Sequence, residues 1–206
     1  MFQIRIHGRG GQGVVTAAEM LSIAAFLEGR YAQAFPTFGS ERTGAPIMAF
    51  CRIDDREIRV REPIVRPDAL IVQDATLLGR PGLFAGLNPR GYVLINSARG
   101  LAELGLTGPA TAFLRERLLT VPATELALKH LGRPVPNAVL LGAFSAMSGV
   151  VSLESVQAAV RQKFSGRTAE RNVAAAADAH AYVLTEMALL AGPRGHAWTG
   201  LEPADA

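Results

Sequence analysis

Apolar and polar residues alternate at the start of the chain. From Phe2 to Ile6 every second residue is apolar, which is the period of a strand with one buried face. Apolar residues then recur at helical spacing from Val14 to Ala25, and Gly29 stands where such a helix would end. The first 29 residues therefore predict a strand, a turn and a helix.

Farther along the chain, short apolar runs predict more strands and longer periodic runs predict more helices. The strands are expected at residues 30–35, 47–53, 57–60, 68–73, 91–96 and 118–121, and the helices at 123–131, 138–148, 153–164 and 168–191. The runs at 47–53 and 57–60 flank Asp54-Asp55-Arg56 and predict an inserted β-hairpin. The continuous apolar run at 68–73 is typical of a central parallel strand.

This order of elements predicts an α/β fold, a Rossmann-like and mostly parallel sheet flanked by helices, with the inserted hairpin and a helical C-terminal part. We expect one domain over residues 1–191, followed by a flexible or partner-docking tail at 192–206. Asp74 and Asn137 are expected as helix caps, with a ligand contact as the alternative for Asp74. Small residues around Gly142 make the helix at 138–148 slim, so another helix should approach it closely.

A glycine-rich turn joins the first strand to the first helix. Gly8, Gly10 and Gly13 have the G-x-G-x-x-G spacing. Such glycines let the backbone approach a ligand, and the first N–H groups of the helix carry a partial positive charge. We therefore predict an anion site whose candidate residues are Gly8, Gly10, Gly11, Gln12 and Gly13. The alternative is that these glycines only permit a tight turn with close packing of helix on sheet.

The sequence also narrows the kind of anion. A dinucleotide fold usually carries an acidic residue at the end of its second strand, to hold the ribose hydroxyls. Here the second strand runs into Pro36 and Thr37 without a carboxylate, and Glu28 precedes it. Val14 and Val15 follow the last glycine, where a nucleotide-hydrolysing loop would have Lys and Ser or Thr. The turn is suited to a phosphate, but not to ordinary NAD binding or to nucleotide hydrolysis.

A second loop, Pro36 to Pro46, follows the second strand at the edge of the sheet where open α/β folds bind ligands. Arg42 could meet another phosphate or a partner's carboxylate, and Ser40 offers a hydroxyl. An exposed turn with a local pair between Glu41 and Arg42 is an equal alternative.

Composition limits the class of protein further. Hydrophobic residues make up 49% of the 206 residues and charged residues 19%, so the chain is globular and apolar enough to cover a partner. The net charge of +3 comes from scattered arginines, which predicts no nucleic-acid surface. The chain starts directly with strand residues and has no apolar run near 18 residues, so we expect a soluble, cytoplasmic protein without membrane contact.

Candidate chemical residues are few. Cys51, the only cysteine, lies in an apolar run and is expected to be buried and reduced; alone it cannot hold an iron–sulfur cluster. His180 lies in an apolar helical stripe and is expected to be packed, whereas His7, beside the glycine turn, stays open. We predict no catalytic residue and no metal ligand, since protease, hydrolase, kinase and diphosphate–metal motifs are absent.

Four stretches together resemble a known family: IRIHGRGGQGVVTAAEML, PTFGSERTGAPIMAFCRID, DALIVQD and VPNAVLLGAFS. They are similar to the gamma subunit of 2-oxoacid:acceptor oxidoreductases, which include pyruvate:ferredoxin oxidoreductase, over about Phe2 to Val183. The resemblance implies a Rossmann-like subunit of a complex that decarboxylates a 2-oxo acid oxidatively to acyl-coenzyme A and CO2. The SERTGAP loop is more similar to the pyruvate-type branch than to the branch marked by PEMRGG.

The resemblance also implies a division of labour. Thiamine diphosphate, Mg and the iron–sulfur clusters would belong to alpha, beta and delta partners, with ferredoxin or another acceptor receiving the electrons. This chain would help to form the coenzyme A site. By position, Gly10, Gly11, Gln12 and Gly13 become candidates for the phosphates of coenzyme A. Ser40, Glu41 and Arg42 become candidates for the coenzyme or for the face turned to the catalytic subunits.

Two hypotheses of other classes stay open at this stage. The glycine spacing alone would also fit a freestanding oxidoreductase that binds NAD or a flavin. The apolar helices and the tail would also fit a purely structural subunit.

Overall fold

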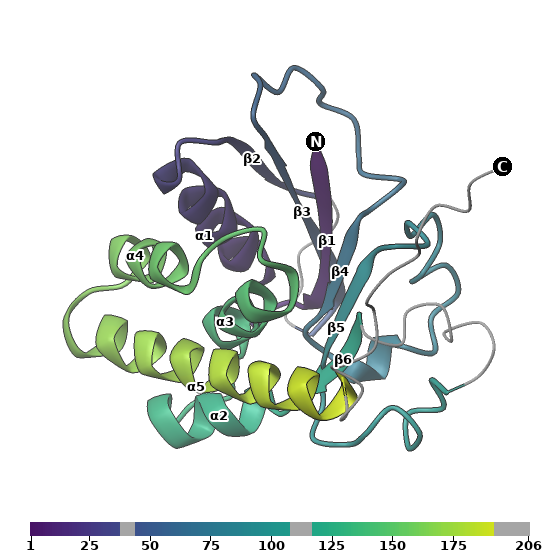
Figure 1. Cartoon of the computed structure of the whole chain (residues 1–206), viewed down its shortest axis with the longest axis vertical. Coiled ribbons are helices and arrows are strands. Elements are labelled where there is room, and N and C mark those ends of the chain that lie inside the picture. Colours follow the sequence, from purple (N-terminus) through teal and green to yellow (C-terminus); the bar gives the residue numbers. More distant parts are fainter. Residues whose placement is uncertain (38–43, 108–116, 192–206) are drawn as a thin grey trace, which may run out of the picture.

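The structure, a computed structural model, describes residues 1–37, 44–107 and 117–191 of the chain. In these ranges it contains one six-stranded sheet whose strand order is β2-β3-β1-β4-β5-β6 (Figure 1). The strands are β1 (Phe2–Arg9), β2 (Tyr31–Pro36), β3 (Pro46–Asp54), β4 (Ala69–Val72), β5 (Tyr92–Asn96) and β6 (Leu118–Val121). Strands β1, β4, β5 and β6 are parallel, whereas β3 pairs antiparallel with β1 and β2. The predicted α/β fold with a mostly parallel sheet is confirmed.

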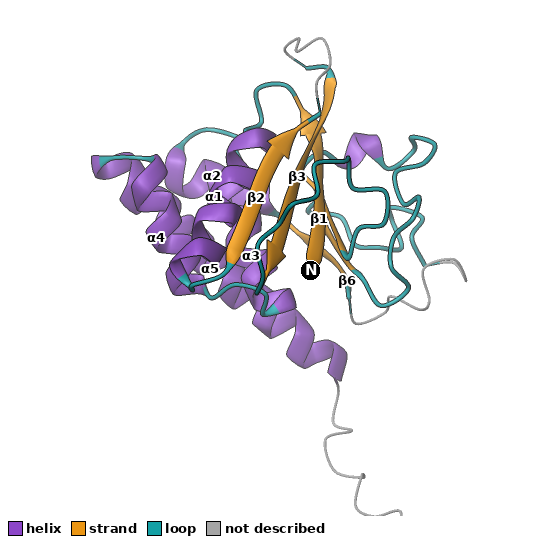
Figure 2. Ribbon diagram, turned by 90° about the horizontal axis from the view of Figure 1, so that it is seen from above, coloured by secondary structure: helices purple, strands orange, loops and turns teal. Residues whose placement is uncertain are grey.

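The helices are α1 (Val14–Leu27), α2 (Ala123–Leu131), α3 (Asn137–Ser148), α4 (Leu153–Lys163) and α5 (Gly166–Ala191). They gather on one face of the sheet, and loops cover the other face (Figures 1 and 2). The connections from β4 to β5 and from β5 to β6 lie on the loop side, where the described part contains only the 3₁₀ turn η1 (Ala75–Leu77). The sheet therefore has a helix face and a loop face.

The alternation along the strands separates two apolar cores. On the helix face, Ile4, Ile6 and Ile71 pack with α1 and α3 in the larger core. On the loop face, the intervening residues Leu70 and Val72 pack with Leu83 and other leucines of the loops. Successive residues of a strand point to opposite faces, so residue parity decides to which core each side chain belongs.

The inserted antiparallel element has a different partner from the one expected. Residues 57–60 form no strand, and β3 pairs instead with the preceding strand β2, in the register that places Phe35 opposite Phe50. The prediction of a hairpin between 47–53 and 57–60 is therefore wrong. The reason is tertiary. Arg52 of β3 donates hydrogen bonds to the backbone carbonyls of Val60 and Glu62, and these bonds hold the segment against the loop face.

Helix α3 is the slim helix of the bundle and lies directly on α5. An added Cβ at Gly142 would lie 2.1 Å from the carbonyl oxygen of Ala176, so the two backbones touch at this point. The expected close approach is confirmed. By length and composition α5 could cross a membrane, but it packs on α2, α3 and α4 and buries residues such as Ala176 and Ala179. In the structure it is part of the helical layer.

Candidate functional site

The glycine turn continues directly from β1. Gly10 pairs with the end of the second loop, because its N–H donates to the carbonyl of Ala45 (2.9 Å) and its carbonyl accepts from the N–H of Gly44 (3.1 Å). The N–H of Gln12 donates to the carbonyl of Arg9 (3.1 Å) and closes the turn. Gly11 and Gly13 have φ angles of 95° and 73°, which favour glycine. The sequence therefore folds here into the turn that its glycines predict.

Helix α1 begins behind this turn without a cap. Gly13 is the N-cap residue, and among the described residues no side chain accepts a hydrogen bond from the first N–H groups. The first turn of the helix also carries no acidic residue. Its N–H groups and its partial positive charge are therefore left for an external anion or water.

Two of the glycines are also required for packing. A Cβ at Gly8 would lie 2.6 Å from Cγ2 of Val14, and one at Gly13 would lie 2.4 Å from Nδ2 of Asn137. At Gly11, by contrast, a Cβ would have no neighbour within 4 Å, and this residue is exposed. Close packing thus explains Gly8 in full and Gly13 in part, whereas the positive φ angle explains Gly11.

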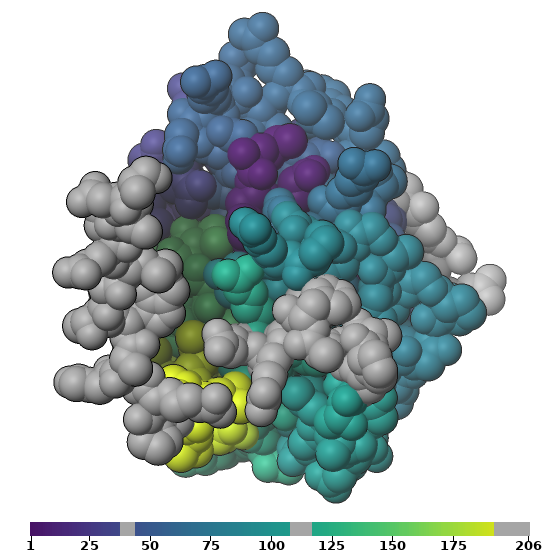
Figure 3. All heavy atoms as spheres, turned by 45° about the vertical axis from the view of Figure 1, so that its right-hand side comes forward, coloured from purple at the N-terminus to yellow at the C-terminus, as the bar shows by residue number. Residues whose placement is uncertain are grey.

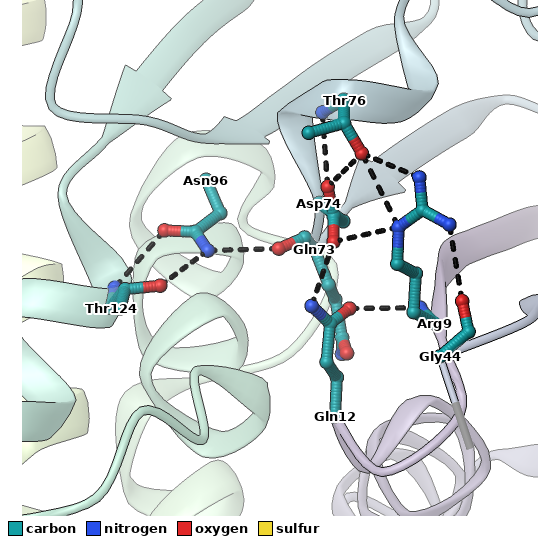
Figure 4. Close-up of polar contacts among 8 residues, drawn as sticks. All are labelled: Arg9, Gln12, Gly44, Gln73, Asp74, Thr76, Asn96 and Thr124. Atoms are coloured by element: carbon teal, nitrogen blue, oxygen red, sulfur yellow. Dashed lines mark hydrogen bonds and ion pairs between the residues drawn. The ribbon is translucent and has the colours of Figure 1, made fainter.

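Gln12 braces the turn against the neighbouring strand (Figure 4). Its Oε1 accepts from the N–H of Arg9 (2.8 Å), and its Nε2 donates to Oδ2 of Asp74 (2.9 Å). Asp74 also accepts from the N–H of Thr76 (3.0 Å) and pairs with the Arg9 guanidinium (3.2 Å). Since its side chain is occupied, Gln12 holds the turn in place, and ligand contacts would come from the backbone.

The carboxyl group of Asp74 is stabilised in its charged form. Burial works to raise its pKa, but hydrogen bonds from Thr76 and Gln12 and the charge of Arg9 outweigh this effect and hold the pKa below its ordinary value. Asp74 caps η1 through Thr76, so the predicted capping role is confirmed, although the capped element is a 3₁₀ turn.

The next strand end carries a second polar link. Oδ1 of Asn96 accepts from the N–H of Thr124 (3.0 Å) at the start of α2. Its Nδ2 donates to the backbone carbonyl of Gln73 (2.8 Å) and to Oγ1 of Thr124 (2.8 Å) (Figure 4). The start of α3 also lies here, because Asn137 touches Gly13. The N-termini of α1, α2 and α3 thus converge at the carboxyl edge of the parallel strands.

Asn137 was expected as the N-cap of α3, and this prediction is wrong. Pro136 is the N-cap residue, Asn137 is the first helical residue, and its Oδ1 accepts from the N–H of Ala138 (2.8 Å). The side chain of Asn137 lies against Gly13, and such a contact between distant residues leaves no local signal in the sequence.

Gln73 is a site residue that the sequence did not single out. It is 1% exposed at the end of β4, and its backbone N–H donates to the carbonyl of His7 (2.7 Å). Neither its Oε1 nor its Nε2 has a hydrogen-bond partner in the described part of the chain. A polar residue directly after an all-apolar strand was the available signal, because the carboxyl ends of such strands form binding sites.

The candidate residues of the second loop, Ser40, Glu41 and Arg42, lie outside the described residues. The described end of this loop adjoins the glycine turn, through the bonds of Gly44 and Ala45 to Gly10. Across residues 1–37, 44–107 and 117–191 no group of histidine, cysteine or acidic side chains could hold a metal ion. Burial raises the pKa of the Cys51 thiol to about 12, so this cysteine stays protonated and inert.

The fold and its carboxyl edge define a Rossmann-like α/β protein with an open helix N-terminus at the strand ends. The family model described as pyruvate ferredoxin/flavodoxin oxidoreductase matches residues 3–182. The chain belongs to this family, in which its relatives are gamma-type subunits of oxidoreductase complexes, and the resemblance seen in its motifs is confirmed.

The similarity extends over nearly the whole length of the relatives. The pyruvate synthase subunit PorC of Methanocaldococcus jannaschii is 47% identical over 176 residues, which are 85% of this chain and 93% of the relative. The gamma subunit common to the pyruvate and ketoisovalerate oxidoreductases of Thermococcus kodakarensis is 46% identical over 182 residues, or 87% and 95%. The crystal structure of the pyruvate oxidoreductase subunit PORC of Thermotoga maritima has a TM-score of 0.73 at 34% identity, covering 87% of this chain and 95% of that one.

Proposed function

We propose that this chain is the gamma subunit of a cytoplasmic, multisubunit 2-oxoacid:ferredoxin oxidoreductase, most similar to the pyruvate type, and that it binds the phosphates of coenzyme A. Alpha, beta and delta partners would carry thiamine diphosphate, Mg and the iron–sulfur clusters, and would pass electrons to ferredoxin or another acceptor. The chain alone would be inactive, because the cofactors of the reaction would be held by its partners.

The observation that carries the coenzyme A proposal is the open start of α1. An uncapped helix N-terminus without acidic residues attracts a phosphate group, and Gly11 leaves room for it to approach. Coenzyme A carries several phosphates, and the second loop, with Arg42, returns to the same turn at Gly44. This combination supports a phosphate-rich carrier at the carboxyl edge of the sheet.

The strand order argues against the NAD alternative. In a dinucleotide fold the second strand lies next to the first, and its terminal acid reaches the ribose. Here β3 lies between β1 and β2, which displaces the end of β2 by about 4.8 Å, one strand spacing. Glu28 is also engaged, since its Oε1 accepts from the N–H of Ser152 (2.7 Å) at the start of α4. In the part of the chain that the structure describes, a ribose therefore lacks its acidic partner at the end of β2.

Two substitutions of glycine, one in the turn and one elsewhere, test the coenzyme A proposal. Gly11→Val should raise the Michaelis constant for coenzyme A in the assembled complex by about tenfold or more, because the side chain blocks the open amides. Decarboxylation without coenzyme A should persist. Gly13 is unsuitable for this purpose, since any Cβ there collides with Asn137.

Gly132→Val is the matched control. Gly132 ends α2 with a φ of 67° and no neighbour within 4 Å of its added Cβ, so the backbone strain is similar but lies away from the turn. If both variants change the Michaelis constant equally, or neither does, the glycine turn is not the coenzyme A site. In that case the purely structural role of the subunit is favoured.

A further inference from the structure

A cavity opens on the loop face of the sheet. It has a volume of about 320 Å³ and lies between the strands β1 and β3 on one side and η1 with the segment that follows it on the other. In Figure 3 the segments from β3 to residue 107 form much of the surface around the start of β1. The lining residues are Arg5, His7, Thr37, Pro46, Ile47, Met48, Leu77, Arg80, Pro81, Gly82 and Leu83.

Among the described residues, Arg5 is a buried cation without an anionic partner. It is 7% exposed, and Nη2 donates to the carbonyls of Leu83 and Ala85 (both 2.9 Å). Within the described ranges its Nε is buried and has no hydrogen-bond partner. Desolvation lowers the pKa of this guanidinium, and no carboxylate compensates its charge there. A buried charge held only by neutral groups is costly, and an anion in the cavity would offset that cost.

His7 and Arg80 extend the positive potential of the cavity. Burial, together with the neighbouring charges of Arg5 and Arg80, lowers the pKa of His7 to about 4. Among the described residues, Nε2 of His7 is also buried without a partner. None of the lining residues, all of which are described, is acidic. The polar side of the cavity thus presents two cations and a neutral imidazole.

The rest of the lining includes an apolar side. Its side chains are Met48 of β3 and Leu77 and Pro81 beyond β4. Met48 lies directly opposite His7 in the antiparallel pairing, so the apolar and cationic sides meet on neighbouring strands. We propose that this cavity binds a small organic carboxylate, with its carboxylate toward Arg5 and Arg80 and its apolar group on Met48 and Leu77.

This site is independent of the coenzyme A proposal. The side chains of Arg5 and His7 alternate along β1 with Ile4 and Ile6, which belong to the core beneath the helices. The glycine turn leads into α1, which packs on the helix face of the sheet. A role of Arg5 limited to anchoring Leu83 and Ala85 would need only Nη2, and would explain neither the second arginine nor the cavity.

The test measures binding of benzoate to the purified complex by calorimetry, with the isosteric neutral amide benzamide and with inorganic phosphate as comparisons. Benzoate should bind once per copy of this subunit, and more tightly than either comparison. Arg5→Gln should weaken benzoate at least about tenfold, and Arg80→Gln, at an exposed position, about twofold to fivefold. Bound benzoate should also raise the pKa of His7 from about 4, which NMR of the imidazole detects.

Arg90→Gln is the matched control, because Arg90 is exposed in the same segment and does not line the cavity. It should leave benzoate binding unchanged. Equal binding of benzoate and benzamide, preference for phosphate, no binding, or equal losses in Arg80→Gln and Arg90→Gln would each overturn the proposal. Since Arg80 is exposed, its variant keeps the test valid even if Arg5→Gln fails to fold. The coenzyme A constant is expected to stay unchanged in Arg80→Gln, which separates this proposal from that of the glycine turn.

Discussion

At the scale of single residues, buried polar side chains determine how the loops are held on the sheet. Arg52 is 1% exposed, lies with its guanidinium 5.0 Å from the ring centre of Phe35, and binds the carbonyls of Val60 and Glu62. It therefore replaces the strand pairing that the sequence suggested for residues 57–60. A single buried guanidinium can do this because it donates in several directions at once.

Arg52→Met should lower the free energy of unfolding by about 2–4 kcal/mol, because it leaves backbone carbonyls unpaired while keeping most of the side-chain volume. Denaturant unfolding measures the change. Arg56→Met, at an exposed neighbouring position, should change the free energy by less than about 0.5 kcal/mol. Similar losses in the two variants would show that Arg52 does not hold the segment.

Asp74 makes the free energy of unfolding depend on pH in the acidic range. Its pKa is held below the ordinary value in the folded state, so its contribution is complete above the unfolded pKa of about 4 and is lost as the pH falls through the folded pKa. Asp74→Asn should cost about 1 kcal/mol at pH 7 and much less near pH 2. Urea unfolding at both pH values measures this. Asp55→Asn, at a carboxylate whose side chain is 85% exposed, should change little at pH 7, and an equal loss there would contradict the assignment.

At the scale of elements, local sequence signals predicted the bounds best where an element begins and ends at residues of its own sequence. The strand at 118–121 and the helix at 123–131 have the predicted bounds, and Ser152 caps α4 by accepting from the N–H of Ser155 (3.1 Å). Strands that depend on a partner were harder to place, since pairing is decided between distant residues. The assumed partner of β3 was wrong for this reason.

The contact of α3 with α5 also belongs to this scale. Gly142→Ala should destabilise the chain by about 1–3 kcal/mol, although alanine normally favours a helix, because the new methyl group would collide with the Ala176 carbonyl. Thermal or denaturant unfolding measures the change. Gly79→Ala, where an added Cβ meets nothing within 4 Å, is the control and should be nearly neutral. A stabilised Gly142→Ala variant would mean that the helices can separate without cost.

At the scale of the whole molecule, the sheet separates two kinds of surface. The helix face ends at a carboxyl edge where three helix N-termini converge, which suits a phosphorylated carrier. The loop face contains the cavity with Arg5 and Arg80. A sheet covered by helices on one side leaves its other side to loops, and such loops can form binding sites without changing the core.

The sequence by itself determined the α/β class, the order and approximate bounds of most elements, the glycine turn and the family. These features rest on periodicity, on backbone freedom and on motifs that are contiguous in the chain. Only the tertiary structure decided that β3 lies between β2 and β1, that Asn137 faces Gly13, and that Arg5, His7 and Arg80 share a cavity. The physical reason is that strand pairing, burial and uncompensated charge depend on residues far apart in sequence, which only the folded chain brings together.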